Sequence, residues 1–367
     1  MTGVAPRFHW FLPTGGDSRT LATGAHGTGI GAAGRSAGVA GRPATLAYLT
    51  TLARAVDDLG YDAVLTPTGA HCADAWITTA ALIGATRRVK FLVAFRPGLV
   101  EPALAAHMAA TFQQLSAGRV LLNVVTGSSA AEQRAYGDHA DHDARYARAA
   151  EFLGIVQRLW TGERFDHRGA YYALEQAELR EPPTPTPDVY LGGSSDAALP
   201  VAADHADSYL TWGEPPALVA EKVDRVRDLA AARGRTLRFG LRVHVVARDT
   251  EAEAWADAER LIAGLDDATI AAGQARLRSL ESVGQRRMLD LHGGSRDGLV
   301  VAPNLWAGIG LVRGGAGTAL VGSHAQVADR IEEYRAVGIE EFILSGYPHL
   351  EEAYAFAEGV RPLLTPA

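Results

Sequence analysis

Arg242 and His244 are the residues of this chain whose spacing points most directly to chemistry. They alternate along the apolar run 239–246, so both side chains face the same side of a strand. An arginine can grip an oxyanion with two hydrogen bonds, and a histidine can move protons near neutral pH. A satisfied structural ion pair is the alternative, but in apolar surroundings the pattern favours an anion-binding site with an acid–base group.

Arg313 lies in the glycine-rich, apolar run 311–322, which suits neither a regular helix nor a strand. Long irregular segments in compact domains are often functional lids. We therefore expect Arg313 to sit on a mobile lid that closes over an anion.

Cys72 is the only cysteine in 367 residues, and it lies where a strand over 63–66 leads into a helix over 74–86. It could be an activated thiol, a polar group beside a cofactor, or a small core residue. The adjacent His71 and Asp74 keep the reactive interpretation open. A single cysteine excludes an internal disulfide and suggests a reducing compartment.

Two polar clusters have alternative interpretations. The run from Gly192 to Asp196 follows a strand and opens a helix, so it could hold a phosphate or simply cap the helix. The acids and histidines over 138–143 resemble a metal cluster, but a solvated helix start with capping acids is favoured, and we expect no metal. Trp10 and Trp212, on or at the end of strands, could stack on a ring system or belong to the core.

Short apolar strands alternate with helical patterns through nearly the whole chain, and this places the polar groups. Strands are expected at 8–12, 63–66, 90–95, 120–125, 189–191, 208–212, 239–246 and 342–347. Strands that are apolar on both faces and separated by helices indicate a parallel sheet. Eight such units predict a (β/α)8 TIM barrel, with a doubly wound open sheet as the alternative. The active site of a barrel lies at the carboxyl ends of its strands.

The organisation predicted is one domain over 1–367 with insertions at about 15–42, 163–187 and 251–325, the last including the lid. Composition limits the function classes: 35 basic and 42 acidic residues give a net charge of −7, which argues against nucleic-acid binding. The apolar runs are too short to span a bilayer, and the N-terminus lacks the features of a signal peptide. We expect a cytoplasmic protein with no membrane or nucleic-acid partner.

Several motifs, in order along the chain, resemble those of the two-component alkanesulfonate monooxygenases of the bacterial luciferase-like flavin family. They include Phe11-Leu12-Pro13-Thr14, Cys72-Ala73-Asp74-Ala75-Trp76, Asn123-Val124-Val125-Thr126-Gly127-Ser128, Gly192-Gly193-Ser194-Ser195-Asp196, Leu210-Thr211-Trp212-Gly213-Glu214-Pro215-Pro216, Asn304-Leu305-Trp306-Ala307-Gly308, the Arg313 run and Ser345-Gly346-Tyr347-Pro348-His349-Leu350-Glu351-Glu352. The resemblance covers nearly the whole chain.

The resemblance implies a luciferase-like barrel enzyme that takes reduced FMN (FMNH2) as a substrate from a separate NAD(P)H-dependent flavin reductase. With O2 it oxygenates the carbon bearing a sulfonate, and the C–S bond breaks to give sulfite and a carbonyl product. The role implied is in sulfur metabolism, and the assembly implied is a homodimer or homotetramer.

The resemblance also assigns residues. The catalytic set is Arg242, His244, Arg313, Tyr347 and Cys72, the cysteine tuning oxygen chemistry rather than acting as a nucleophile. The flavin-binding set is Asn123, Thr126, Tyr146, Gly193, Ser194 and Ser195. The substrate pocket takes Trp212, His349, Gly15 and His71.

Two departures from the family pattern concern the substrate. Gly15 replaces a histidine, and His71 stands where the family often has serine. The glycine opens space beside the first strand, which favours a bulkier or more polar sulfonate. A sulfosugar such as sulfoquinovose is the specific alternative within the class, and a non-sulfonate substrate of a luciferase-like monooxygenase is the alternative outside it.

Overall fold

Eight parallel strands close into a barrel in the computed structural model, which describes residues 5–23 and 41–364. The strands are β1 (Arg7–Phe11), β4 (Ala63–Thr66), β5 (Lys90–Phe95), β6 (Val120–Val124), β9 (Val189–Gly192), β10 (Ser208–Trp212), β11 (Arg238–Arg248) and β15 (Glu341–Ser345). Each pairs with the next, β15 pairs with β1, and β10 pairs with β11, so no edge is left open in the ring. The predicted (β/α)8 fold is confirmed, and the open-sheet alternative is wrong.

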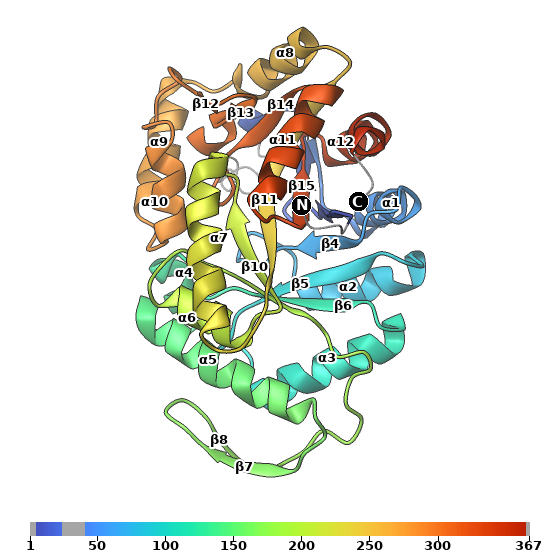
Figure 1. The fold of residues 1–367 in the computed structure, drawn as a ribbon, viewed down its shortest axis with the longest axis vertical. Helices are drawn as coiled ribbons and strands as arrows, with labels where there is room; N and C mark the ends of the chain where they lie inside the picture. Colours follow the sequence, from blue (N-terminus) through green and yellow to red (C-terminus); the bar gives the residue numbers. More distant parts are fainter. Residues whose placement is uncertain (1–4, 24–40, 365–367) are drawn as a thin grey trace.

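Helices cover the outer face of the barrel (Figure 1). They are α1 (Leu46–Asp58), α2 (Ala75–Leu82) with the 3-10 turn η2 (Ile83–Ala85), α3 (Pro102–Ser116), α4 (Ala130–Ala135), α5 (His142–Leu159), α6 (Ala198–His205), α7 (Pro216–Ala231), α11 (His324–Ala336) and α12 (His349–Ala355). The chain then continues through η4 (Phe356–Val360) and η5 (Arg361–Leu363). Because helices and barrel interior bury both faces of each strand, the strands are apolar without alternation.

The first insertion returns to the barrel as a small antiparallel pair. β2 (Asp17–Ser18) pairs with β3 (Gly41–Arg42), and η1 (Leu21–Thr23) follows β2. Residues 24–40 of this insertion lie outside the described residues. The pairing places Asp17 beside the barrel mouth, and its role is taken up below.

The second insertion contains an antiparallel hairpin, β7 (Phe165–Arg168) with β8 (Ala173–Ala177). Figure 1 shows it extending away from the barrel, beyond α3 and α5. It contributes no residue to the cavity described below.

The third insertion lies within the predicted bounds but is more regular than the sequence predicts. It holds α8 (Glu251–Ile262), α9 (Asp267–Arg278), α10 (Val283–Asp290), β12 (Val300–Ala302), β13 (Leu305–Trp306), η3 (Gly308–Leu311) and β14 (Ala319–Ser323). The expectation that no part of 311–322 is a strand is wrong. β11 is 11 residues long, and its end beyond the barrel offers free backbone groups that β14 pairs with in parallel, from Ala319 opposite His244 to Ser323 opposite Arg248.

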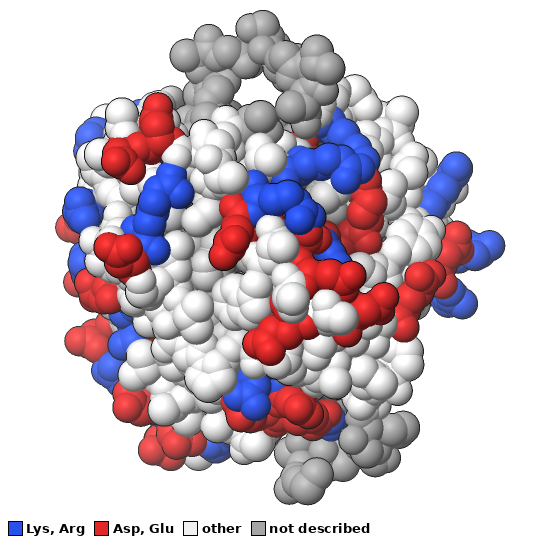
Figure 2. All heavy atoms as spheres, turned by 90° about the horizontal axis from the view of Figure 1, so that it is seen from above, with Lys and Arg blue, Asp and Glu red and all other residues white. Residues whose placement is uncertain are grey.

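Within the described residues, no helix combines the length and the apolar character that a membrane span requires. On the face shown in Figure 2, Lys and Arg side chains lie among Asp and Glu side chains instead of forming one large basic field.

Candidate active site at the carboxyl ends of the barrel strands

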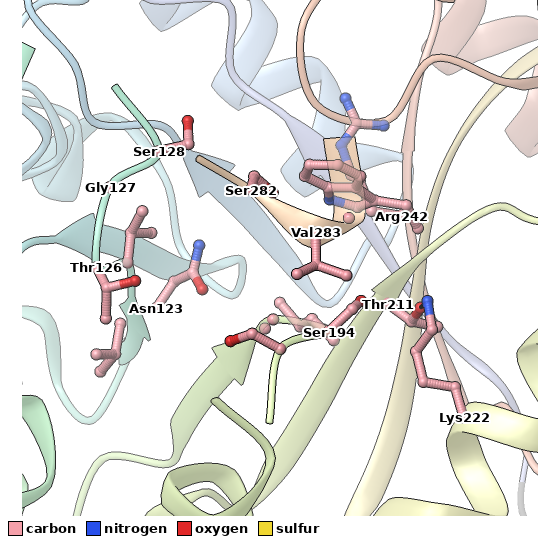
Figure 3. A pocket seen from close by; sticks show the side chains of 18 of the residues that line it. Asn123, Thr126, Gly127, Ser128, Ser194, Thr211, Lys222, Arg242, Ser282 and Val283 are labelled. Atoms are coloured by element: carbon pink, nitrogen blue, oxygen red, sulfur yellow. Dashed lines mark hydrogen bonds between the residues drawn. The ribbon is translucent and has the colours of Figure 1, made fainter. Parts of the chain in front are cut away.

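A cavity of about 1050 Å³, its open mouth included, lies where β6, β9 and β10 end, beside the middle of β11. Figure 3 shows its walls, with Asn123 and Thr126 on one side and Arg242 and Lys222 on the other. The cavity brings together eight of the predicted residues: Asn123, Thr126, Tyr146, Gly193, Ser194, Ser195, Trp212 and Arg242. Those positions span 119 residues of sequence and meet because parallel strands end at one rim.

One end of the cavity is lined by hydroxyl groups. The Tyr146 hydroxyl interacts with the side chains of Thr126 and Ser195, and burial raises the pKa of Tyr146, so it stays a neutral donor. The Ser195 hydroxyl also accepts from the Ala198 amide at 3.2 Å, at the start of α6. Both interpretations of the 192–196 run, phosphate seat and helix cap, are therefore compatible with its geometry.

Gly193 makes this end a cradle that a phosphate fits. Its φ is +144°, and a Cβ added there would lie 2.7 Å from the Tyr146 hydroxyl and 2.7 Å from the Ala198 Cβ. Without that atom, the backbone leaves room for a ligand beside the hydroxyls and the first amides of α6. A mononucleotide phosphate here would leave the part of the cavity lined by Asn123 and Trp212 for a ring system.

Arg242 and Arg313 form a cationic pair at the rim, and both lie over the ring of Phe11, at 4.7 and 5.6 Å from its centroid. They are only 6% and 5% exposed. Arg242 donates from Nη2 to the Ser345 hydroxyl at 2.8 Å and from Nη1 to the Val243 carbonyl.

Arg313 Nη1 donates to the carbonyls of Gly314 and Ala316, at 2.8 and 3.1 Å, while its Nε has no partner. Over residues 5–23 and 41–364, neither Arg313 nor Arg242 forms an ion pair with a carboxylate. Burial, with the nearby Arg313, lowers the pKa of Arg242 well below its usual range. The pair is thus a buried, uncompensated positive charge. The mobility expected of the Arg313 loop stays a prediction.

His244 lies beside Arg242 with both ring nitrogens engaged. Its Nε2 faces the Ala316 carbonyl at 3.1 Å, and its Nδ1 lies 2.7 Å from the Ser345 hydroxyl. A carbonyl only accepts, so Nε2 carries the proton and Nδ1 accepts from Ser345. Burial, followed by the charges of Arg242 and Arg313, lowers the pKa of His244 well below its ordinary value. The imidazole is therefore neutral.

Tyr347 and His349 follow β15. The sequence predicts that this strand ends at Tyr347, but it ends at Ser345, two residues earlier. Tyr347 stacks on His244 with centroids 5.4 Å apart, and His349 stands edge-on to Tyr347 at 5.2 Å. Burial raises the pKa of Tyr347, and a hydrogen bond with Arg313 opposes that rise. Tyr347 is therefore a neutral hydroxyl beside the cationic pair.

Cys72 does not line the cavity, although the charge of Arg313 still acts on it. Burial raises its pKa to about 11, and the neighbouring Thr14 hydroxyl offsets this only in part. A thiol of that pKa is protonated at neutral pH, which argues against the nucleophile interpretation. His71 and Gly15 are exposed and likewise lie outside the cavity.

The cavity also contains residues that the sequence does not single out. Lys222 donates from Nζ to the Thr211 hydroxyl at 2.8 Å and lies 3.3 Å from Glu214, which Arg287 of α10 grips with bonds of 2.7 and 2.6 Å. Residues 282–284, just before and in α10, form another wall. Arg287 and residues 282–284 come from the third insertion, so no local pattern near Lys222 and Glu214 predicts that they meet.

Two other sequence alternatives are decided by contacts. Asp141 caps α5, accepting from the Ala144 amide at 2.8 Å, and Asp138 pairs with Arg148 at 2.6 Å. Within the described residues, no three His, Cys, Asp or Glu side chains converge as a metal site would require. Trp10 is fully buried against Tyr61 and belongs to the core.

The comparisons with known proteins agree with this geometry. Residues 6–341 match the family model described as luciferase-like monooxygenase. Three solved structures share the fold at low identity: the riboflavin lyase RcaE (TM-score 0.80, 24% identity, 98% of this chain and 91% of that one), the long-chain alkane monooxygenase LadA (0.76, 20%, 99% and 91%) and the EDTA monooxygenase EmoA from Chelativorans sp. BNC1 (0.72, 20%, 98% and 93%). With a match over most of its length, this chain belongs to the luciferase-like monooxygenase family.

Proposed function

We propose that this protein is a two-component monooxygenase that uses reduced FMN and O2 to cleave the C–S bond of an organosulfonate. The observation that carries the proposal is the buried pair Arg242 and Arg313, which has no carboxylate partner among the described residues. In the balanced reaction, R-CH2-SO3⁻, O2 and FMNH2 give R-CHO, HSO3⁻, FMN and H2O.

The arginine pair suits a sulfonate on energetic grounds. Burying an unpaired charge costs several kcal/mol, and a bound anion would offset part of that cost. A sulfonate is anionic at every working pH, and the guanidinium fork matches its oxygens. The orphaned Nε of Arg313 is a donor that such a ligand could satisfy.

FMN fits the other end of the cavity, where the hydroxyls of Thr126, Tyr146 and Ser195 would hold its phosphate beside Gly193. When bound in its reduced form, the flavin supplies the two electrons that activate O2. A separate NAD(P)H-dependent flavin reductase would deliver it, as the resemblance to the two-component enzymes implies.

The remaining residues of the site would orient the sulfonate and shield it from water. Arg242 and Arg313 would hold the sulfonate so that its carbon faces the ring-binding part of the cavity near Trp212. The neutral Tyr347 hydroxyl would donate beside them, and the neutral thiol of Cys72 would act as a polar neighbour rather than an attacking group. The burial of both guanidinium groups keeps bulk water from this end of the site.

The substrate within the class is a second question. The resemblance to the alkanesulfonate enzymes puts Gly15 where a histidine is usual, at an exposed position in the turn after β1 that does not line the cavity itself. On that resemblance, the loss of the side chain favours a bulky or polar sulfonate such as sulfoquinovose. An uncharged substrate such as an alkane would leave both arginines unused.

The test is sulfite release from a panel of sulfonates, with a flavin reductase, NADH and FMN supplied. We expect sulfite from at least one member, and faster turnover of sulfoquinovose than of octanesulfonate. Equal or slower turnover of sulfoquinovose would reject the sulfosugar, and flavin oxidation with no sulfite from any sulfonate would reject the sulfonate class.

A further inference from the structure

The site contains two histidines whose hydrogen bonds differ in kind. Both ring nitrogens of His244 are hydrogen-bonded, one to the Ala316 carbonyl and the other to the Ser345 hydroxyl, which also accepts a hydrogen bond from Arg242. To take up a proton it would have to become a cation beside two arginines. It is therefore poorly suited to carry a proton in the reaction.

His349 instead bonds to a carboxylate from the first insertion. Its Nδ1 lies 2.9 Å from Asp17 Oδ1, and its backbone amide donates to Asp17 Oδ2 at 2.9 Å. The Tyr48 hydroxyl also donates to Oδ2, and the Ser18 amide donates to Oδ1 at 2.8 Å. Asp17 is thus a fully hydrogen-bonded carboxylate with only 2% of its surface exposed.

These bonds determine which nitrogen of His349 holds its proton. Burial would raise the pKa of Asp17, but His349 and Tyr48 together lower it, so the carboxylate is ionised and can only accept. Nδ1 of His349 therefore carries a hydrogen, and Nε2 makes no hydrogen bond with any described residue. The two histidines hold their hydrogens on opposite nitrogens.

His349 does not line the cavity itself, but it packs against the aromatic rings beside the two arginines. Its ring is 5.2 Å from that of Tyr347 and 5.8 Å from that of Phe11, on which both arginines rest. The carboxylate of Asp17 thus fixes the imidazole of His349. The ring of Phe11 lies between this imidazole and the two arginines.

We propose that Asp17 is a positioning residue that orients His349, and that His349 Nε2, rather than His244, exchanges the proton of the reaction. The proposal rests on the sulfonate monooxygenase function. The carbon that becomes a carbonyl loses one proton, Nε2 accepts it, and Nε2 returns it to the oxygen that leaves as water. The imidazole is unchanged over the cycle.

The first test needs no turnover. In ¹⁵N-labelled, flavin-free protein, two-bond proton–nitrogen spectra should show His349 protonated at Nδ1 and His244 at Nε2, with signals assigned from His349→Gln and His244→Gln. In Asp17→Asn the Nδ1 signal of His349 should shift or split, while that of His244 stays in place. A wild-type His349 protonated at Nε2 alone would overturn the dyad, whatever the substrate.

The second test separates turnover from binding. His349→Gln should lower kcat for sulfite release about 100- to 10,000-fold, the usual scale for an acid–base group. Asp17→Asn should lower kcat less, about 10- to 100-fold, because it removes only the group that orients the imidazole. The KM for the sulfonate and the Kd for reduced FMN should change less than about threefold.

Asp224→Asn, the same substitution in an exposed pair with Arg227 on α7, is the matched control and should match wild type. Thermal unfolding checks that each variant is folded, and His349→Gln carries the test alone if Asp17→Asn is not. An unchanged kcat in His349→Gln would overturn the proposal. Failure of the wild-type enzyme to release sulfite would instead overturn the proposed function.

Discussion

Arg238 and Arg242 lie on the same face of β11, about 13 Å apart along the strand, yet their surroundings are opposite. At the amino end of the barrel, Arg238 donates to Glu341 at 2.6 Å and to Asp188 at 2.7 Å. At the carboxyl end, Arg242 has a second arginine, Arg313, as its charged neighbour. The same strand thus carries a compensated charge at the amino end of the barrel and an uncompensated one, Arg242, toward the carboxyl end of the barrel.

The difference separates structural from functional charge. The barrel supplies Glu341 to neutralise Arg238, which is only partly buried, yet within the part of the chain that the structure describes it leaves the buried Arg242 without a carboxylate. Glu341 is completely buried and also lies 3.3 Å from His9 and from Arg7. The amino end is therefore a closed ion network, whereas the carboxyl end lacks an anion that a substrate can provide.

Breaking the closed end should have the largest effect, and it should be on stability. Although burial opposes it, bonding with His9 and Arg238 lowers the pKa of Glu341 to about 2. Its contribution is present above the unfolded pKa of about 4.3 and is lost as the pH falls through about 2. Glu341→Gln should cost about 3 kcal/mol at pH 7, because the buried carboxylate that Arg238 and Arg7 share is lost.

Denaturant unfolding between pH 2 and pH 7 measures that loss. The gap between wild type and Glu341→Gln should shrink as the pH approaches 2. A gap that is constant over this range would show that Glu341 acts through packing and not through its charge.

Breaking the open end should leave the fold intact and remove activity. Arg313→Ala deletes one charged donor set, worth about 1.5–3 kcal/mol, so kcat/KM for sulfite release should fall about 10- to 100-fold. Reduced FMN should still bind. Arg168→Ala in the exposed β7–β8 hairpin is the matched control and should match wild type. Equal loss of flavin binding and sulfite release would mean that Arg313 serves the flavin.

A substitution at the hydroxyl-lined end of the cavity should have a smaller effect, and it should weaken flavin binding instead of turnover. Tyr146→Phe removes a neutral hydroxyl that touches Thr126 and Ser195, worth about 0.5–1.5 kcal/mol. The Kd for FMN should rise about 2- to 10-fold in a fluorescence titration, with kcat at saturating flavin unchanged. A fall in kcat without a change in Kd would contradict a role in holding the phosphate.

The smallest effect is expected at Cys72. Because its pKa is raised to about 11, the thiol is protonated at pH 8, and alkylation by iodoacetamide should be slow there and accelerate only as the pH approaches 11. Cys72→Ser should keep kcat within a few-fold of wild type. Rapid alkylation at pH 7 would show an activated thiolate and restore the nucleophile interpretation.

The sequence predicts the barrel well because each strand and helix has a local signature, from the apolar run 90–95 to the capping acid Asp141. It also places Arg242 and His244 on one face, since that follows from strand alternation alone. The same logic brings Asn123 and Ser194 to one rim.

The sequence does not predict contacts between loops that are far apart along the chain. β14 forms because β11 is long enough to pair with it. The residues 319–323 themselves contain no pattern that predicts this pairing. The Asp17–His349 bond joins residues 332 positions apart, and the Lys222–Glu214–Arg287 cluster depends on an insertion whose docking is tertiary. The neutrality of His244 follows from burial and from two arginines, neither of which can be judged from its own strand.

The most direct test of the central claim is a single-turnover measurement of sulfite released per reduced FMN oxidised, made with the best sulfonate of the panel. If the paired arginines hold a sulfonate for oxygenation, wild type should approach one sulfite per flavin, and Arg313→Ala should oxidise the flavin with almost none. A wild-type ratio near zero, with all of the oxygen recovered as hydrogen peroxide, would contradict it.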